Sequence, residues 1–307
     1  MSRVSVQWEV TNRCNLRCKH CLPLSGDPRP NELSPQEAKV ALAKFQSVGA
    51  TLISFTGGEA FFRPDFPDLI LEVVKMGMQA SVITNATLLN GETLLFVQEH
   101  VRDLAISLDG ATASTNDFIR GKGTFNKTLS ALQSCRELNI PVRLNVTITK
   151  ANIGELTELA RIAAKFCPLG VFFSEMNVAG RALQFRNDLA LSDADRKALP
   201  VSVAEVVQTV LEETLSPPDD DCWVDSTTLF MTAEGNLYSC IEIFQRRPEL
   251  SIGNIRSLDM EQWQRESAWR LNGHKKKCCY GVYVSEHAVF VSNRSPICAF
   301  SPERGAG

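Results

Sequence analysis

Short apolar runs alternate with longer amphipathic segments through the first part of the chain. The runs are only a few residues long and rich in valine, isoleucine and phenylalanine, which is typical of buried parallel strands. We therefore expect six strands, at Val4–Val10, Leu52–Phe55, Ala80–Thr84, Leu104–Leu108, Val142–Ile148 and Val171–Ser174.

The segments between these runs predict helices. Ser34, Pro35 and Glu37 combine an N-cap, a proline at the first helical position and a capping-box glutamate. Strands that alternate with helices predict an α/β fold with a parallel sheet and right-handed crossovers. An open sheet and a curved partial barrel both fit, and in either one the chemistry belongs at the carboxyl ends of the strands. Apolar residues at helical spacing predict further helices at Asp65–Met76, Gly91–His100, Phe125–Asn139 and Asn152–Phe166.

The pattern changes after about residue 180. Asp193–Leu215 reads as one more helix, and a turn-rich junction, 216–221, follows it. Thr228–Thr232 and Leu237–Ile241, separated by the turn residues 233–236, then predict a β-hairpin. We expect a first domain over residues 1–190, a helical linker over 191–221 and a small hairpin-containing domain over 222–307.

Composition and charge exclude several classes of protein. A chain of 307 residues with 44% apolar and 22% charged residues is typical of a globular protein. The net charge of −3 argues against nucleic acid or a membrane as partner. The sequence has no apolar run long enough to cross a membrane and no signal-peptide core at its start. We therefore expect a cytoplasmic protein.

The ten cysteines are unevenly distributed. Disulfides are disfavoured in the reducing cytoplasm. Cys135 and Cys167 stand alone in predicted helical surroundings and are interpreted as buried structural residues. The other eight form two groups and predict two metal sites, the first at Cys14, Cys18 and Cys21, the second drawn from Cys222, Cys240, Cys278, Cys279 and Cys298.

Cys14, Cys18 and Cys21 directly follow the first predicted strand, so one loop can present three thiolates to one site. Thiolates select zinc, copper(I) or an iron–sulfur cluster. A structural zinc site needs four ligands, and His20 would have to fold back to supply the fourth. A four-iron cluster with three cysteine-bound irons and one open iron fits three ligands directly.

The string from Trp8 to Cys21, with its C-x-x-x-C-x-x-C spacing, resembles the first strand and loop of the radical SAM superfamily. The resemblance implies a partial (β/α)6 TIM-like barrel. It also implies a [4Fe-4S] cluster on Cys14, Cys18 and Cys21, with S-adenosylmethionine at the open iron.

Further motifs occur in the order that this superfamily has them. Gly57, Gly58 and Glu59 end the second strand and resemble the segment that contacts the amino group of S-adenosylmethionine. Glycines let a backbone approach a ligand closely. Ala60 stands where the superfamily usually has proline, a mild departure because the backbone and Glu59 carry the contact.

Polar residues after the third strand, at the end of the fourth and on the fifth complete the implied cofactor site. Ser107 and Asp109 lie two residues apart, so they share one strand face, and Ser107 resembles a cofactor-binding residue. Arg120 resembles an arginine that pairs with the cofactor carboxylate; the alternative is a solvated loop charge. Asn85 and Asn145 resemble positions that line the cavity, and for Asn145 a hydrogen-bonded core amide is the alternative.

Cys222 and Cys240 bracket the predicted hairpin and resemble the entry motif of the SPASM and twitch auxiliary-cluster domains. Five cysteines suffice for one four-ligand cluster, so the resemblance implies the smaller, twitch-like type. Cys222, Cys240 and Cys298 are the expected ligands, together with either Cys278 or Cys279. A zinc site is the alternative, because four thiols also suit zinc.

The resemblance implies an enzyme that generates a 5′-deoxyadenosyl radical and abstracts hydrogen from a substrate C–H bond. The first hypothesis is an oxidoreductase that matures a ribosomally made peptide or protein. Because the chain starts at the first strand, leader recognition would fall to a separate protein or an exposed strand edge. The second is oxidation or rearrangement of a small metabolite or cofactor precursor.

A third hypothesis, an iron–sulfur electron carrier without enzyme activity, is disfavoured because a carrier needs no cofactor cavity. The enzyme hypotheses imply an external electron donor such as flavodoxin or ferredoxin. The sequence assigns no catalytic residue beyond the cofactor and metal sites.

Overall fold

The computed structural model describes residues 4–199, 228–238, 248–263, 282–285 and 288–291. The predicted helix Asp193–Leu215 is therefore described over residues 193–199 alone, and these are helical. No helix in the described ranges is long and apolar enough to cross a membrane. Five cysteines predicted as auxiliary-cluster ligands lie outside these ranges: Cys222, Cys240, Cys278, Cys279 and Cys298.

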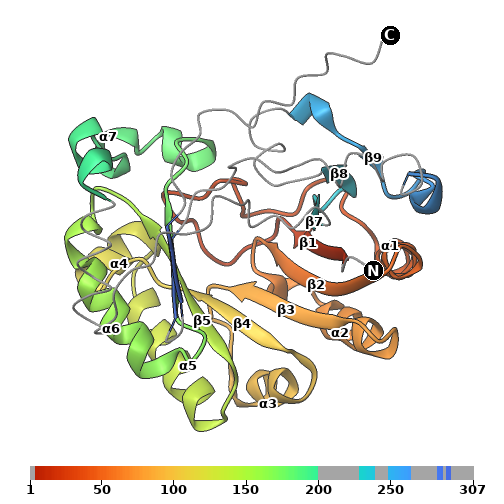
Figure 1. Cartoon of the computed structure of the whole chain (residues 1–307), viewed down its shortest axis with the longest axis horizontal. Coiled ribbons are helices and arrows are strands. Elements are labelled where there is room, and N and C mark those ends of the chain that lie inside the picture. The colour runs from red at the N-terminus through yellow and green to blue at the C-terminus, as the bar shows by residue number, and fades with distance from the viewer. Residues whose placement is uncertain (1–3, 200–227, 239–247, 264–281, 286–287, 292–307) are drawn as a thin grey trace.

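All six predicted strands are present and form a parallel run in chain order within an eleven-stranded sheet. The sheet curves, and the helices lie around its outside, as in a partial barrel (Figure 1). The predicted α/β fold is confirmed. The strands of the parallel run are β1 (Val4–Thr11), β2 (Ala50–Gly57), β3 (Gln79–Thr84), β4 (Asp103–Ser107), β5 (Val142–Ile148) and β6 (Val171–Glu175).

The helix signals in the sequence are confirmed with small shifts of the bounds. The Ser34 side chain accepts a hydrogen bond from the Glu37 amide while the Glu37 carboxylate accepts one from the Ser34 amide, which is the predicted capping box. The sequence analysis missed α4, α7 and the short 3-10 turns. The α-helices are α1 (Pro35–Ser47), α2 (Phe66–Lys75), α3 (Gly91–His100), α4 (Ala113–Arg120), α5 (Thr124–Glu137), α6 (Leu156–Phe166) and α7 (Arg186–Leu189), and the 3-10 turns are η1 (Ala60–Phe62), η2 (Ile153–Glu155), η3 (Gly180–Leu183) and η4 (Pro248–Leu250).

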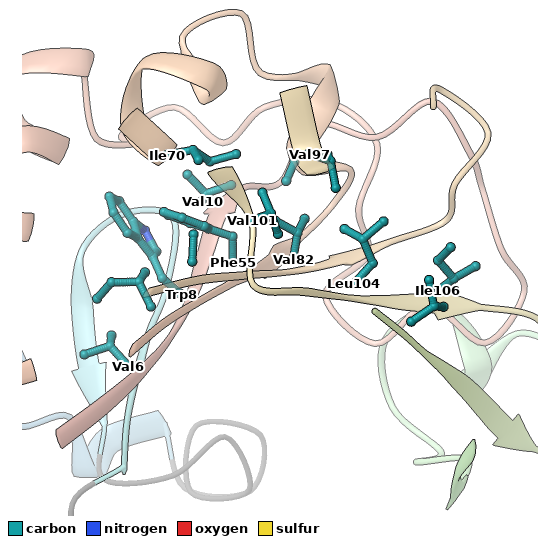
Figure 2. Close-up of a cluster of buried hydrophobic side chains, with 14 of the residues drawn as sticks. Val6, Trp8, Val10, Phe55, Ile70, Val82, Val97, Val101, Leu104 and Ile106 are labelled. Atoms are coloured by element: carbon teal, nitrogen blue, oxygen red, sulfur yellow. The ribbon is translucent and has the colours of Figure 1, made fainter. Parts of the chain in front are cut away.

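Strand alternation separates an apolar outer face of the sheet from a polar inner face. Val6, Trp8 and Val10 of β1 are fully buried or nearly so and point toward the side where Ile70 of α2 and Val97 of α3 lie (Figure 2). Successive side chains of a strand point to opposite faces. The alternate residues of β1, including Glu9, therefore face the inside of the curve, where polar groups gather at the carboxyl ends of the strands.

The predicted β-hairpin is also present, as the antiparallel pair β7 (Thr228–Met231) and β8 (Asn236–Tyr238). β7 pairs in parallel with β1, and β9 (Gly253–Asn254) pairs with β8. Leu229, Met231 and Leu237 belong to the same buried apolar cluster as the barrel strands. This part of the predicted third domain therefore extends the barrel sheet, a placement that the sequence analysis did not anticipate.

A second hairpin lies at the opposite edge of the sheet. β10 (Val282–Ser285) pairs antiparallel with both β6 and β11 (Ala288–Val291). Segments from the end of the chain thus flank the parallel run on both sides.

Candidate functional site

The loop after β1 carries three free cysteine thiols at the carboxyl end of the sheet. Cys14, Cys18 and Cys21 are all partly exposed. The Leu16 amide donates to the Cys14 sulfur at 3.4 Å, and the Ser25 amide donates to the Cys21 sulfur at 3.2 Å. Hydrogen bonds to the sulfurs are among the features that tune cysteine-ligated iron–sulfur clusters. The donor set therefore fits a cluster with three cysteine ligands.

The Cys18 thiol lies in surroundings that disfavour its thiolate. Burial raises the pKa of Cys18 to about 12, against the opposing charge of Arg120. A thiol with this pKa is a poor nucleophile, and a metal must displace its proton. Within the described ranges, no three His, Cys, Asp or Glu side chains are placed to hold a single metal ion. A four-iron cluster does not require such convergence, because each thiolate binds a different iron.

The Gly57-Gly58-Glu59 segment lies directly against the cysteine loop. The Gly58 amide donates to the Thr11 carbonyl at 2.7 Å, and the Glu59 amide donates to the Arg13 carbonyl at 2.9 Å. A β-carbon at Gly58 would lie 2.2 Å from the Arg13 carbonyl oxygen, which leaves no space for a side chain. The glycine thus permits close approach of two backbones, one of them the loop that carries the thiols.

We expect the Gly58→Ala variant to displace the cysteine loop. Overpacking of this kind costs about 1–3 kcal/mol. The thermal unfolding midpoint and the iron content of anaerobically purified protein should both fall. Gly91→Ala is the matched control, because Gly91 begins α3 and has no atom within 4 Å of its added β-carbon. Wild-type values for Gly58→Ala would contradict the steric argument.

Glu59 joins the ends of β2 and β3. Its fully buried carboxylate accepts hydrogen bonds from the Thr84 hydroxyl at 2.7 Å and the Asn85 amide at 2.8 Å. Burial raises the pKa of Glu59 to about 7, although these hydrogen bonds oppose the shift. The Asn85 side-chain amide donates to Asn15 at 3.0 Å and lies 4.0 Å from the Cys14 sulfur. Asn85 is therefore placed beside the predicted metal ligands.

A buried charge network connects the end of β4 to the cysteine loop. The fully buried Asp109 carboxylate lies 2.6 Å from the Arg120 Nε and 2.5 Å from the His20 Nε2, and it accepts the Thr147 amide at 2.7 Å. Burial alone would raise the pKa of Asp109, but the charges of Arg120 and His20 hold it below its ordinary value. His20 thus contacts Asp109, although the sequence analysis had considered it as a fourth metal ligand.

Arg120 is buried at the end of α4, so it is not the solvated loop charge that was the alternative. Its carbonyl oxygen lies 3.8 Å from the Cys18 sulfur. The backbone of Arg120 is therefore adjacent to the predicted cluster ligand Cys18, and its guanidinium, which the sequence predicted for the cofactor carboxylate, is oriented by Asp109.

Ser107 and Asn145 are paired in register on neighbouring strands β4 and β5. Both are partly exposed on the inner face. The Asn145 side-chain oxygen accepts a hydrogen bond from the Arg143 Nε at 3.2 Å. Polar side chains from two strands thus stand together on the inner face of the sheet.

Sequence reasoning missed the contribution of Asn152, which it placed only at the start of a predicted helix. The Asn152 side-chain amide donates to the carbonyls of Asp109 at 2.7 Å and Thr147 at 2.8 Å. Its side-chain oxygen accepts the Thr149 amide at 2.7 Å. Asn152 therefore ties together the segments that follow β4 and β5. An asparagine just after a strand end was the available signal.

A parallel sheet with three thiols at its carboxyl end defines an α/β protein with the donor set of an iron–sulfur site. The family model of the radical SAM superfamily matches residues 8–163, about half of the chain, from β1 into α6. The chain therefore belongs to the radical SAM superfamily, whose members use S-adenosylmethionine and a [4Fe-4S] cluster.

Known relatives support this assignment. The chain is 31% identical over 261 residues to the Fe-coproporphyrin III synthase of Methanosarcina barkeri, covering 84% of this chain and 63% of that protein. It is 36% identical over 166 residues to the mycofactocin maturase MftC of Mycobacterium tuberculosis, covering 53% and 42%. The chain thus spans between 42% and 63% of the length of these two curated relatives.

A solved structure shares the fold. SuiB of Streptococcus suis bound to S-adenosylmethionine matches with a TM-score of 0.66 at 16% identity, over 85% of this chain and 65% of that chain.

Proposed function

We propose that this protein generates a 5′-deoxyadenosyl radical, abstracts hydrogen from a substrate C–H bond and thereby oxidatively modifies a ribosomally made peptide. The proposal depends on one observation. The loop after β1 carries three free thiols at the carboxyl end of the sheet, and the backbone of the Gly57–Glu59 segment forms hydrogen bonds with this loop. When bound, a reduced iron–sulfur cluster and S-adenosylmethionine would together supply the radical.

The residues of the chain hold and orient these groups. In our proposal Cys14, Cys18 and Cys21 bind the cluster, and Arg120 pairs with the carboxylate of S-adenosylmethionine. Asp109 already forms ion pairs with Arg120 and His20 and accepts the Thr147 amide, so it acts by orienting the Arg120 guanidinium. The remaining cofactor contacts that we propose come from Gly57, Gly58, Glu59, Asn85, Ser107 and Asn145.

We further propose a twitch-like auxiliary iron–sulfur cluster, most simply a second [4Fe-4S], in a domain over residues 222–307. Its ligands would be Cys222, Cys240, Cys298 and either Cys278 or Cys279. The hairpin β7–β8 between Cys222 and Cys240 supports this proposal, because it forms as the resemblance implies. A four-cysteine cluster has no open iron and suits electron transfer, which favours net oxidation of the substrate. An external donor such as flavodoxin or ferredoxin would reduce the first cluster.

The similarity to MftC, named a mycofactocin maturase, supports a maturation reaction. We propose a peptide as the substrate, with a separate protein binding its leader. A specific observation also favours a second candidate, oxidation of a cofactor precursor. The alignment with Fe-coproporphyrin III synthase extends over 261 residues, against 166 residues for MftC. Both candidates use the same radical chemistry and differ in substrate alone.

Anaerobic turnover distinguishes these proposals. Reconstituted protein is incubated with S-adenosylmethionine and dithionite, and 5′-deoxyadenosine is measured by chromatography. We expect 5′-deoxyadenosine, and a mass loss of hydrogen from a short precursor peptide encoded beside the gene. Formation of Fe-coproporphyrin III from a precursor, in place of a modified peptide, would select the second candidate. Intact S-adenosylmethionine under these conditions would contradict both.

A further inference from the structure

The 3-10 turn η3, which follows β6, reaches back to the cysteine loop that follows β1. The Arg181 backbone amide donates to the Cys21 carbonyl at 2.9 Å. Its guanidinium donates to the Cys18 carbonyl at 2.9 Å through Nη1 and to the Ser25 carbonyl at 2.7 Å through Nη2. One residue therefore binds three carbonyls of the loop, two of which belong to cysteines that we assign as cluster ligands.

Gly180 allows this approach. Its φ is +58°, in the left-handed region that disfavours other residues. A β-carbon at Gly180 would lie 2.1 Å from the Leu22 carbonyl oxygen and 2.6 Å from the Cys21 carbonyl oxygen. The Gly180-Arg181 pair thus brings one backbone into direct contact with the loop while the guanidinium extends along it.

The turn is anchored independently of the loop. Ala182 is fully buried in a small apolar cluster with Ile119, Met176 and Leu189, which lies apart from the main core. The Lys19 amide also donates to the Ile119 carbonyl at 2.8 Å, which attaches the loop to the same cluster. The loop is therefore held from two sides: Gly58 and Glu59 hold its start, and η3 and α4 hold its cysteine-rich turn.

We propose that Arg181 is a positioning residue that fixes the separation and orientation of Cys18 and Cys21, so that η3 completes the cluster site. A planar guanidinium with donors in a rigid fork can hold two carbonyls at once, which lysine cannot do with the same geometry. Without these hydrogen bonds the loop gains conformational freedom. Cluster binding must then offset the conformational entropy that is lost when the loop becomes ordered. Outer contacts of this kind typically change metal affinity by about 10- to 100-fold.

The test compares iron release from reconstituted holoprotein. Iron transfer to a chelator is followed by absorbance under anaerobic conditions, and the reduced cluster is recorded by electron paramagnetic resonance with and without S-adenosylmethionine. For Arg181→Gln we expect release about 10- to 100-fold faster and an altered resonance signal. Arg181→Lys should be intermediate. Arg161→Gln is the control, since Arg161 forms an exposed ion pair with Glu158 on α6 and its loss leaves no buried charge unpaired.

Gly180→Ala provides an independent variant, because it keeps the guanidinium and displaces the turn. It should also accelerate iron release. Wild-type release and an unchanged signal in both Arg181→Gln and Gly180→Ala would overturn the proposal. The proposal would also be overturned if both cluster-free variants unfolded at a lower temperature than the cluster-free wild type by the same amount, and if this loss of stability accounted for the faster iron release. Absence of iron from the wild type would refute the proposed function instead, so the two failures are distinguishable.

Discussion

The Cys18→Ala variant is expected to lose about four irons per chain and to form no 5′-deoxyadenosine above background. Cys18 supplies one of three thiols from a single loop, and its sulfur lies 3.8 Å from the carbonyl oxygen of the buried Arg120. With two thiols left, the cluster has no stable attachment. Iron and sulfide analysis and anaerobic turnover with S-adenosylmethionine measure the effect. If the auxiliary cluster is present, the wild type should hold about eight irons and the triple variant Cys14/Cys18/Cys21→Ala about four.

Cys135→Ala is the matched control for this experiment. Cys135 is a free cysteine in α5 that is fully buried in the apolar core, and burial raises its pKa to about 12. Its replacement removes a small core side chain and leaves the loop unchanged. Iron content and 5′-deoxyadenosine should match the wild type. Equal iron loss in Cys135→Ala and Cys18→Ala would mean that the loop has no special role.

The Asp109→Asn variant is expected to destabilise the protein by about 3 kcal/mol, because it leaves the buried Arg120 without its counter-charge. For a chain of 307 residues that loss corresponds to a fall of roughly 5 °C in the thermal unfolding midpoint. S-adenosylmethionine binding should weaken as well, since Arg120 loses the group that orients it. Calorimetry of the anaerobic protein measures the first effect, and equilibrium dialysis with labelled S-adenosylmethionine measures the second.

Two further variants test the buried-pair argument. Glu158→Gln breaks an exposed pair with Arg161, whose side chains are about half accessible, and should change the midpoint little. The double variant Asp109→Asn/Arg120→Gln should lose less than the sum of the two single variants, because no unpaired buried charge remains. Simple additivity, or a midpoint in Asp109→Asn equal to that of the wild type, would refute the role assigned to this pair.

The six strands and the place of the site followed from local sequence patterns. Each strand of the parallel run is marked by a short apolar run, and the structure arranges these six strands side by side in chain order. The carboxyl ends of parallel strands must meet at one edge, so Cys14, Gly58, Asn85 and Ser107 had to come together. The short helix α4, with eight residues, and the turn η3 carried too little periodicity to be recognised.

The particular contacts of the site could not be inferred in this way. Asp109 and His20 are 89 positions apart, and Arg181 and Cys18 are 163 apart. No local pattern pointed to Arg181, because an arginine after a strand is ordinary on a surface. The pairing of β7 was not predictable either: its alternating pattern predicted a hairpin but did not indicate β1 as its partner.

By itself, the sequence determined that this chain alternates strands and helices and carries a three-thiol loop at the end of its first strand, because apolar periodicity and ligand spacing are properties of neighbouring residues. The tertiary structure alone decided that Asp109 orients Arg120, that Glu59 ties β2 to β3, and that Arg181 closes the loop from the far end of the parallel run. These contacts depend on the curvature and register of the whole sheet, which bring distant strand ends within hydrogen-bonding distance. No pattern of neighbouring residues specifies which of these distant side chains meet.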